Sequence, residues 1–174
     1  AYRRQRQMCI RDRANIMKIS DGLFRDIFYE VSKEYPQVQA EDKIVDNVAM
    51  QLVMQPQKFD VIVTENLYGD ILSDLTSGLI GGLGLLPSSN MGEDFAMFEA
   101  VHGSAPDIAG KGIANPTAFL WSACMMLEHL GKQETAVKIR RAVDEVLRQG
   151  TALTPDLGGT AGTKEYTEEI IRQL

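Results

Sequence analysis

Apolar residues repeat every three or four positions in two stretches near the start of the chain, residues 20–33 and 42–55. This spacing places apolar side chains on one face of an α-helix, so both stretches are predicted to be amphipathic helices. Ser20 and Asp21 are expected to cap the first helix. Pro36 and Pro56 follow the two predicted ends, because proline disfavours helix in the residue before it.

Shorter apolar runs predict strands. Residues 59–64 (FDVIVT) are apolar and β-branched, which is typical of a buried strand, and residues 95–101 (FAMFEAV) predict a second one. The strands alternate with further stretches of helical periodicity, which predicts an α/β layered fold. These further helices are expected at residues 68–80, at 117–130 after Pro116, at 133–148 and at 163–174. The helix over 117–130 is apolar on most sides and is expected to be buried.

Residues 81–87 (GGLGLLP) form a glycine-rich stretch. The stretch follows a helix and lacks the Gly-Lys-Ser/Thr ending of a phosphate loop, so a turn is predicted instead. It is also the best candidate for a crossing between two domains. No G-x-G-x-x-G sequence opens a strand-to-helix unit, so the ordinary Rossmann fingerprint is absent.

Composition narrows the function. The chain has 174 residues and a net charge of −6, which argues against a nucleic-acid partner. No apolar run in the sequence is long enough to span a membrane, so no membrane partner is expected. Cys9 and Cys124 lie far apart without metal-type spacing, which is typical of reduced thiols in an intracellular protein.

The charge is uneven along the chain. Residues 1–13 (AYRRQRQMCIRDR) hold five arginines and one aspartate, about +4, so the other 161 residues carry about −10. A transit peptide or an RNA-binding arm is the functional interpretation of such a start. The segment has no serine and little apolar periodicity. We therefore expect it to be foreign to the domain.

Asp70 and Asp74 lie four residues apart in a predicted helix, which stacks two carboxylates on one face. Two carboxylates held together need a cation or a shared proton, and oxygen ligands favour Mg²⁺ or Mn²⁺. The alternative is that both are solvated acids in the first turn, stabilised by the helix dipole. Asp46, in the sequence IVDN, is a third candidate carboxylate.

Residues 102–116 (HGSAPDIAGKGIANP) predict an irregular loop with many unobstructed backbone N–H groups, which suits a diphosphate. The loop adds an imidazole, a carboxylate able to accept two ribose hydroxyls, and an amide able to bind an adenine edge. Composition alone supports an anion-binding loop, and a plain structural loop is an equal alternative.

The chain resembles the β-decarboxylating dehydrogenases, which act on isocitrate, 3-isopropylmalate, homoisocitrate or tartrate. The matching motifs are residues 14–18 (ANIMK), 66–74 (NLYGDILSD), 102–116 and 157–159 (LGG). The resemblance runs from Ala14 to Leu174 and looks like the C-terminal half of such an enzyme. It implies that residues 14–80 belong to a small, dimer-forming and metal-binding domain, and residues 81–174 to a large, cofactor-binding domain.

The resemblance also implies roles for individual residues. Asp70 and Asp74 would bind Mg²⁺ or Mn²⁺, and Asp46 would reach across a dimer interface to the partner's pair. Asp107 would bind the adenosine ribose, and because a carboxylate repels a 2′-phosphate, NAD is expected rather than NADP. The other implied cofactor-binding residues are Asn15, His102, Gly103, Ser104, Ala105, Ile108, Asn115 and Asp156.

One departure concerns catalysis. The family places a catalytic lysine directly before Ala-Asn, where this chain has Arg13, and arginine is a poor general base. The tyrosine acid and the residues that hold substrate belong to the N-terminal half of the family. No catalytic residue is therefore expected to be intact, and the isolated chain is expected to be inactive.

The resemblance is strongest to NAD-dependent isocitrate dehydrogenases, through residues 20–24 (SDGLF) and 153–157 (LTPDL). The parent enzyme would oxidise isocitrate, a 2-hydroxy acid, with NAD and release the β-carboxylate to give 2-oxoglutarate. The alternatives are a 3-isopropylmalate dehydrogenase or a non-catalytic regulatory subunit. A homodimer or higher oligomer is expected, located in the cytoplasm or, in a eukaryote, in the mitochondrial matrix. The helix over 42–55 is expected at the dimer interface, with Val45, Val48 and Leu52 as its apolar contacts.

Overall fold

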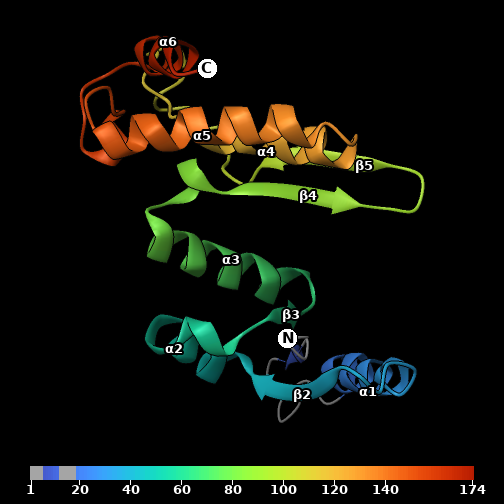
Figure 1. The fold of residues 1–174 in the computed structure, drawn as a ribbon. Coiled ribbons are helices and arrows are strands. Elements are labelled where there is room, and N and C mark those ends of the chain that lie inside the picture. The colour runs from blue at the N-terminus through green and yellow to red at the C-terminus, as the bar shows by residue number, and fades with distance from the viewer. Residues whose placement is uncertain (1–5, 12–18) are drawn as a thin grey trace. The chain divides into compact units, whose positions relative to one another are not determined.

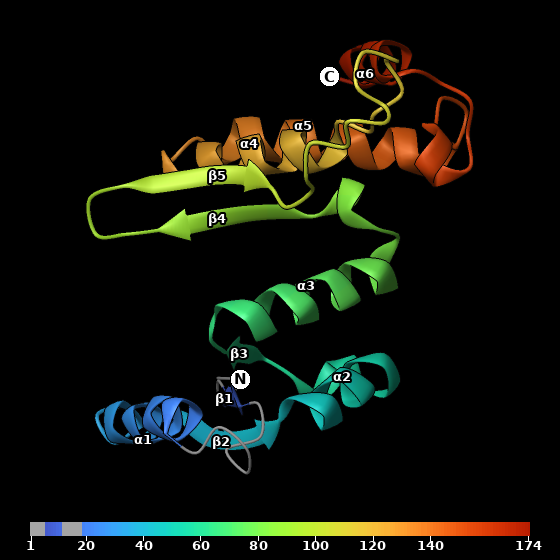
Figure 2. The same cartoon turned by 180° about the vertical axis from the view of Figure 1, so that it is seen from behind.

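The computed structural model describes residues 6–11 and 19–174, and the chain divides into two compact units, Ala1–Leu79 and Ile80–Leu174. Figures 1 and 2 show the ribbon from opposite sides. Strands and helices are mixed in both units, as the sequence predicted. Arg13 and Asn15 lie outside the described residues.

The first unit contains a parallel sheet of three strands in the order β2-β1-β3. These are β1 (Arg6–Arg11), β2 (Gln39–Ile44) and β3 (Val61–Val63). Parallel neighbours need crossover connections, and helices α1 (Ser20–Ser32) and α2 (Val45–Met54) supply them. The central strand β1 lies within the basic segment 1–13. The foreign origin of that segment stays a prediction.

Two sequence predictions are wrong in this unit. Residues 42–44 were expected to open a helix, but they end strand β2, and α2 begins at Val45. Because β2 lies at the sheet edge, its backbone pairing needs no strong apolar pattern, and an apolar pattern was the signal for the strands that were predicted. Ser20 and Asp21 do not cap α1, because the Ser20 hydroxyl donates to the neighbouring Asp21 carboxylate instead.

The core of the first unit joins α2 to helix α3 (Asn66–Ile80). Val48, Leu52 and Leu72 are buried, and other apolar residues of α2, α3 and the β3 region pack against them. The sequence had suggested Val45, Val48 and Leu52 as contacts to a second subunit. Val48 and Leu52 are only 0% and 4% exposed in the chain itself, so that assignment is wrong for them.

The second unit is built on an antiparallel hairpin of β4 (Pro87–Met91) and β5 (Ala96–Ala100). Helix α4 (Thr117–His129) packs on both strands, α5 (Gln133–Gln149) packs on α4, and α6 (Thr163–Arg172) packs on α5. In both views α4 and α5 lie on the same side of the hairpin (Figures 1 and 2). Strand β4 was missed because its sequence, PSSNM, is polar and starts with proline.

Helices α5 and α6 close the core of this unit. Val143 and Val146 of α5 pack with Tyr166 and Ile170 of α6, and all four are nearly or fully buried. Gly150 ends α5 in the left-handed conformation that glycine adopts without a steric penalty. The spacing of these residues is the helical periodicity that predicted both elements.

Helix α4 differs from the prediction on one side. Ala118, Ser122 and Cys124 are buried as expected, and the Ser122 hydroxyl donates to the Glu99 carbonyl of β5 over 2.7 Å. Phe119, however, is 66% exposed and Leu130 61%. Within the described ranges, 6–11 and 19–174, no helix is both long and apolar enough to cross a membrane.

Candidate functional site

Asp70 and Asp74 lie on the exposed side of α3. The helix begins at Asn66 and has no acidic residue in its first turn. Glu65, just before the helix, accepts hydrogen bonds from the N–H groups of Leu67 and Tyr68 at 3.2 and 3.1 Å. Glu65 therefore satisfies the helix start, and the helix dipole, which acts within the first turn, does not account for Asp70 and Asp74.

Asp70 and Asp46 have different hydrogen-bond partners. The Asn66 amide donates to Asp70 Oδ2 over 3.1 Å, which orients that carboxylate along the helix surface. Asp46 lies in the first turn of α2, and its Oδ1 accepts the N–H of Asn47 over 2.6 Å. In the part of the chain that the structure describes, no group of three or more His, Cys, Asp or Glu side chains could hold a metal. Asp46 thus does not complete the Asp70–Asp74 pair within one chain.

The Asp70–Asp74 pair offers some of the ligands that a divalent hard cation needs, but not a complete set. Carboxylate oxygens are the ligands that Mg²⁺ and Mn²⁺ prefer, and both side chains reach solvent. Two carboxylates leave most of an octahedral ligand set to other groups. The metal roles of Asp46, Asp70 and Asp74 stay predictions.

Residues 102–116 form an irregular loop between β5 and α4, as predicted. A turn at its centre is closed by the N–H of Ile108 donating to the Ala105 carbonyl over 3.1 Å. Ala105 has a φ of +42°, a left-handed conformation that costs a non-glycine residue about 1–2 kcal/mol. Such strain persists only where the surroundings impose it, and it concentrates at ligand-binding segments.

The start of the loop is open to solvent. His102, Gly103, Ser104, Ala105 and Asp107 are exposed. The His102 ring makes a hydrogen-bond contact of 3.1 Å with the Gly103 carbonyl, through Nδ1. The backbone around these residues is therefore accessible to a ligand, and Ile108, half-buried, anchors the turn.

The end of the loop is held by side-chain hydrogen bonds. Asn115 is 9% exposed, its Oδ1 accepts the N–H of Thr117 over 3.0 Å, and its Nδ2 donates to Asp156 Oδ2 over 2.9 Å. These two partners fix the orientation of the amide, because an N–H needs an oxygen and a carboxylate needs an N–H. Asn115 and Asp156 are 41 residues apart in sequence, and the fold brings these two predicted cofactor-binding residues into direct contact.

The Asn115 side chain has hydrogen-bonding capacity beyond its two partners. The Asn115 amide retains one N–H and one lone pair beyond the bonds it makes, enough to pair with a base edge. Gly84 packs against the same pair, and a Cβ on it would lie 3.1 Å from Asp156 Oδ2. The close approach of Gly84 to Asn115 and Asp156 therefore favours a residue without a side chain.

Sequence reasoning missed several residues that shape this region. Gly84 belongs to the glycine-rich stretch that was assigned to a turn, and only its contact with Asp156 shows a second reason for glycine. Tyr166 is buried, and its hydroxyl is 2.7 Å from the Thr117 hydroxyl at the start of α4. Burial raises the pKa of Tyr166 above its usual value of 10.0, so its hydroxyl keeps its proton.

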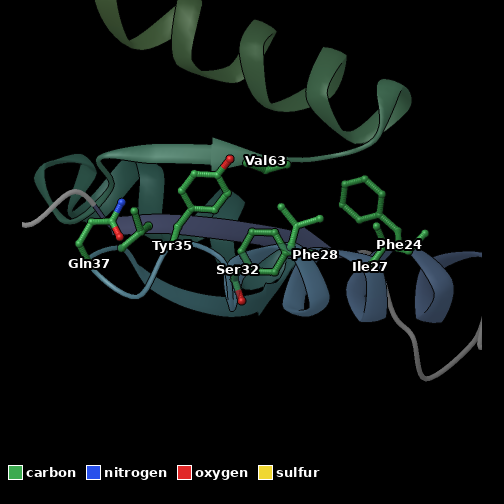
Figure 3. A pocket seen from close by; sticks show the side chains of 9 residues that line it. Phe24, Ile27, Phe28, Ser32, Tyr35, Gln37 and Val63 are labelled. Atoms are coloured by element: carbon green, nitrogen blue, oxygen red, sulfur yellow. The ribbon is translucent and has the colours of Figure 1, made fainter.

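An apolar cavity of about 590 Å³ lies in the first unit (Figure 3). None of the predicted metal or cofactor residues that the structure describes lines it. Its walls are mainly apolar and aromatic, which does not suit a diphosphate or a cation. The lining residues are Phe24, Ile27, Phe28, Val31, Ser32, Tyr35, Gln37, Val38 and Val63.

Comparison with known proteins places the chain among oxidoreductases. The sequence model of a family described as isocitrate/isopropylmalate dehydrogenase matches residues 1–170. With nearly the whole chain matched, this protein belongs to the isocitrate/isopropylmalate dehydrogenase family. The family resemblance expected from the sequence motifs is confirmed.

Individual relatives carry different names. The chain is 57% identical over 172 residues to an isocitrate/homoisocitrate dehydrogenase of Thermus thermophilus, covering 99% of this chain and 51% of that protein. It is also 57% identical over 162 residues to a 3-isopropylmalate dehydrogenase of Methanothermobacter thermautotrophicus, covering 93% and 49%. A mitochondrial regulatory subunit of the NAD isocitrate dehydrogenase of Dictyostelium discoideum is 54% identical over 172 residues, covering 98% and 48%.

The fold is likewise that of the family. A crystal structure of isocitrate dehydrogenase from Methylococcus capsulatus matches with a TM-score of 0.91 at 54% identity, over 97% of this chain and 50% of that one. The predicted α/β fold class is confirmed. The chain spans about half the length of the curated relatives it matches.

Proposed function

We propose that the full-length protein containing this chain is an NAD-dependent decarboxylating dehydrogenase that acts on isocitrate. The observation that carries the proposal is the Asn115–Asp156 hydrogen bond, which joins two separate cofactor motifs at one place beside Gly84. When bound, NAD would supply the hydride acceptor and a divalent cation would supply the Lewis acid. The chain's own residues hold and orient these groups.

Three groups, in the loop and at Asp156, would bind different parts of the cofactor. The exposed backbone around Gly103, Ser104 and Ala105 offers N–H groups to the diphosphate. Asp107, exposed one residue before Ile108, accepts the ribose hydroxyls and repels a 2′-phosphate. Asn115 and Asp156 bind the adenine side. Asn15 would approach the nicotinamide from the neighbouring protomer, as the family resemblance implies.

The cation would be held by Asp70 and Asp74, with Asp46 supplied by a second protomer. The exposed face of α2 supports this arrangement. Asp46 shares that face with Met50, Val53 and Met54, at intervals of four, three and one residues, and the three apolar side chains are 54–65% exposed. A carboxylate at the end of an exposed apolar stripe suits an intersubunit contact that completes a polar site.

Helix α3 shows the same combination. Leu67 and Ile71 are 58% and 52% exposed and share the helix side of Asp70 and Asp74. Apolar surface beside metal-ligand candidates costs solubility unless another protein surface covers it. We therefore propose a homodimer in which α2 and α3 face the partner.

Two alternatives remain within the family. A 3-isopropylmalate dehydrogenase is supported by a relative of that name that is as similar as the isocitrate/homoisocitrate enzyme. A non-catalytic regulatory subunit is supported by the relative from Dictyostelium discoideum and by Arg13 at the family's lysine position. The intact Asp46, Asp70 and Asp74 favour a catalytic role.

The deciding experiment uses the full-length protein with Arg13→Lys, which restores the family's catalytic lysine. It measures kcat/KM with isocitrate, homoisocitrate and 3-isopropylmalate, each with Mn²⁺ and with NAD or NADP. We expect the highest value with isocitrate and NAD, and no turnover by the 174-residue chain alone. A higher value with 3-isopropylmalate would establish the first alternative. Absence of turnover with all three acids would establish the second.

Cofactor preference is tested at Asp107. Replacing a ribose hydrogen bond by repulsion of a 2′-phosphate is expected to favour NAD by about a hundredfold, which corresponds to roughly 3 kcal/mol. Asp107→Lys with Ile108→Tyr should lower the NAD/NADP ratio of kcat/KM by a similar factor. Asp94→Lys, an exposed acid in the β4–β5 turn, is the charge-matched control. An unchanged ratio in the double variant would remove Asp107 from this role.

A further inference from the structure

Helix α6 holds the loop of residues 102–116 by its first residue. The backbone N–H of Thr163 donates to the Gly112 carbonyl over 2.7 Å, and the Thr163 hydroxyl donates to the Ala114 carbonyl. Residues 112 and 114 are about 50 positions earlier in the chain. One threonine therefore binds two carbonyls on either side of Ile113.

The contact is close because Gly162 has no side chain where it meets the loop. A Cβ on Gly162 would lie 2.9 Å from the Gly112 carbonyl oxygen, a distance that real Cβ atoms do not adopt. Gly162 also donates its N–H to Glu165 Oε2 over 2.9 Å, which fixes the entry of the chain into α6. Gly162 thus lets the start of α6 approach the loop closely at Gly112.

These bonds adjoin those of Asn115. Going along the chain, the Gly112 and Ala114 carbonyls are bound by Thr163, and the Asn115 amide is bound by Thr117 and Asp156. Three of the four residues 112–115 are therefore restrained, through four polar contacts. The open start of the loop, around Gly103 and Ser104, has no comparable restraint among the contacts that the structure describes.

We propose that Thr163 is a positioning residue for the cofactor site: its hydroxyl fixes the Ala114 carbonyl and so sets the backbone from which Asn115 projects. This inference rests on the proposed function for its cofactor, but the restraint itself does not. Thr163 does not contact the cofactor in this scheme. It reduces the conformational freedom that the loop would lose on binding.

The test compares two substitutions of Thr163 with one substitution of Thr167, which lies one helical turn further along α6. Thr163→Val removes the hydroxyl and keeps the branched shape, and Thr163→Ser keeps the hydroxyl. Thr167→Val is the matched control, because the Thr167 hydroxyl donates only within α6, to the Thr163 carbonyl over 2.7 Å. Two quantities are measured: amide hydrogen exchange of residues 108–116 in the 174-residue chain, and the Kd for NAD of the full-length protein.

We expect Thr163→Val to raise exchange in residues 108–116 and the Kd for NAD by about five- to tenfold, as for loss of one hydrogen bond. Thr163→Ser should restore both, and Thr167→Val should change exchange only in α6. Unchanged loop exchange in Thr163→Val, or an equal rise in Thr167→Val, would overturn the proposal. So would faster exchange with an unchanged Kd.

The outcome also separates this inference from the proposed function. If the wild-type full-length protein does not bind NAD while loop exchange responds as expected, the proposed function fails and the restraint by Thr163 stands as a structural fact. If NAD binds and the loop does not respond to Thr163→Val, the proposed function stands and the positioning role fails.

Discussion

The apolar residues of helices α2 and α3 in the first unit are less completely buried than those of helices α5 and α6 in the second. In α5 and α6 most of the apolar face is used inside the chain: Val143, Val146, Tyr166 and Ile170 are at most 3% exposed, and Ile171 is the main exception at 62%. In α2 only Val48 and Leu52 are buried, and Val53 on the same helix is 56% exposed. Helices that satisfy one face within the chain and expose another carry surface suited to a second contact.

The difference extends to charge. The exposed side of α5 carries surface ion pairs such as Glu145–Arg148. The exposed apolar sides of α2 and α3 instead carry Asp46, Asp70 and Asp74, for which no ion pair is found among the described residues. The first unit therefore has its candidate metal ligands beside exposed apolar residues, whereas the exposed side of α5 carries paired charges.

The largest expected effect concerns the carboxylates on the first unit. In the full-length protein with Arg13→Lys, Asp70→Asn and Asp74→Asn should each lower kcat/KM by about a hundredfold or more, because a bound cation contributes several kcal/mol of charge stabilisation. Calorimetry with Mn²⁺ should show weaker binding in both variants. Asp94→Asn, in the β4–β5 turn, should behave as wild type. Unchanged Mn²⁺ affinity in both α3 variants would favour solvated surface acids.

A smaller effect is expected on stability, when the same Val→Ala substitution is made in α5 and in α2. Val146 of α5 is fully buried and Val53 of α2 is 56% exposed. Val146→Ala should lower the free energy of unfolding of the 174-residue chain by about 2 kcal/mol, through lost burial and a residual cavity. Val53→Ala should stay within about 0.5 kcal/mol. Urea unfolding followed by circular dichroism measures both, and equal losses would erase the contrast between the two helices.

The exposed face of α2 can be tested as an intersubunit contact in the full-length protein. Val53→Asp should raise the dimer dissociation constant by about tenfold or more, because a charge would be buried without a partner. Ile171→Asp is the control, since Ile171 is a similarly exposed apolar residue on α6 at 62%. Light scattering over a concentration series gives the comparison. A dimer weakened only by Ile171→Asp would place the interface elsewhere.

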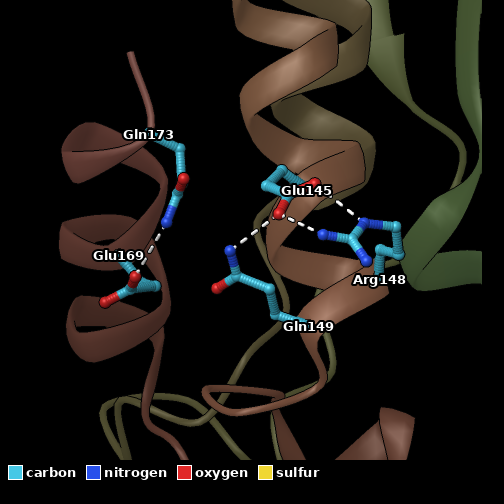
Figure 4. Close-up of polar contacts among 5 residues, drawn as sticks. All are labelled: Glu145, Arg148, Gln149, Glu169 and Gln173. Atoms are coloured by element: carbon cyan, nitrogen blue, oxygen red, sulfur yellow. Dashed lines mark hydrogen bonds and ion pairs between the residues drawn. The ribbon is translucent and has the colours of Figure 1, made fainter.

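The smallest effect concerns the polar side of α5. Arg148 donates to both oxygens of Glu145, with Gln149 as a third contact, and Glu169 has a separate hydrogen bond from Gln173 (Figure 4). The hydrogen bonds from Arg148 and then Gln149 lower the pKa of Glu145 from 4.5 to about 2. A lowered pKa contributes stability above pH 4.5 that is lost as the pH falls towards 2.

Arg148→Gln should move the pKa of Glu145 back towards its usual value, as measured by carboxyl ¹³C shifts during an NMR titration. The change in unfolding free energy should be small, because surface ion pairs are screened by water. Gln149→Ala is the matched control and should move the pKa less. A larger shift in Gln149→Ala than in Arg148→Gln would reverse the assigned order of causes.

The sequence by itself determined most helices and the chemistry to look for. Helical periodicity located α1, α3, α4, α5 and α6 to within a few residues, since apolar residues that recur about every 3.6 positions are a strong local signal. The separated motifs identified the family. The spacing of Asp70 and Asp74 raised the possibility of a paired site, with a solvated first-turn pair as the alternative.

Only the tertiary structure decided the rest. Strands β2 and β4 depend on pairing with a neighbour, and their polar residues carry little local signal. The burial of Val48 and Leu52, the Asn115–Asp156 bond and the hydrogen bond from Thr163 to Ala114 all join residues that periodicity treats separately. The physical reason is the same in each case. A contact between residues that are distant in sequence depends on the tertiary fold, and local residue patterns do not specify which distant segments will pack together.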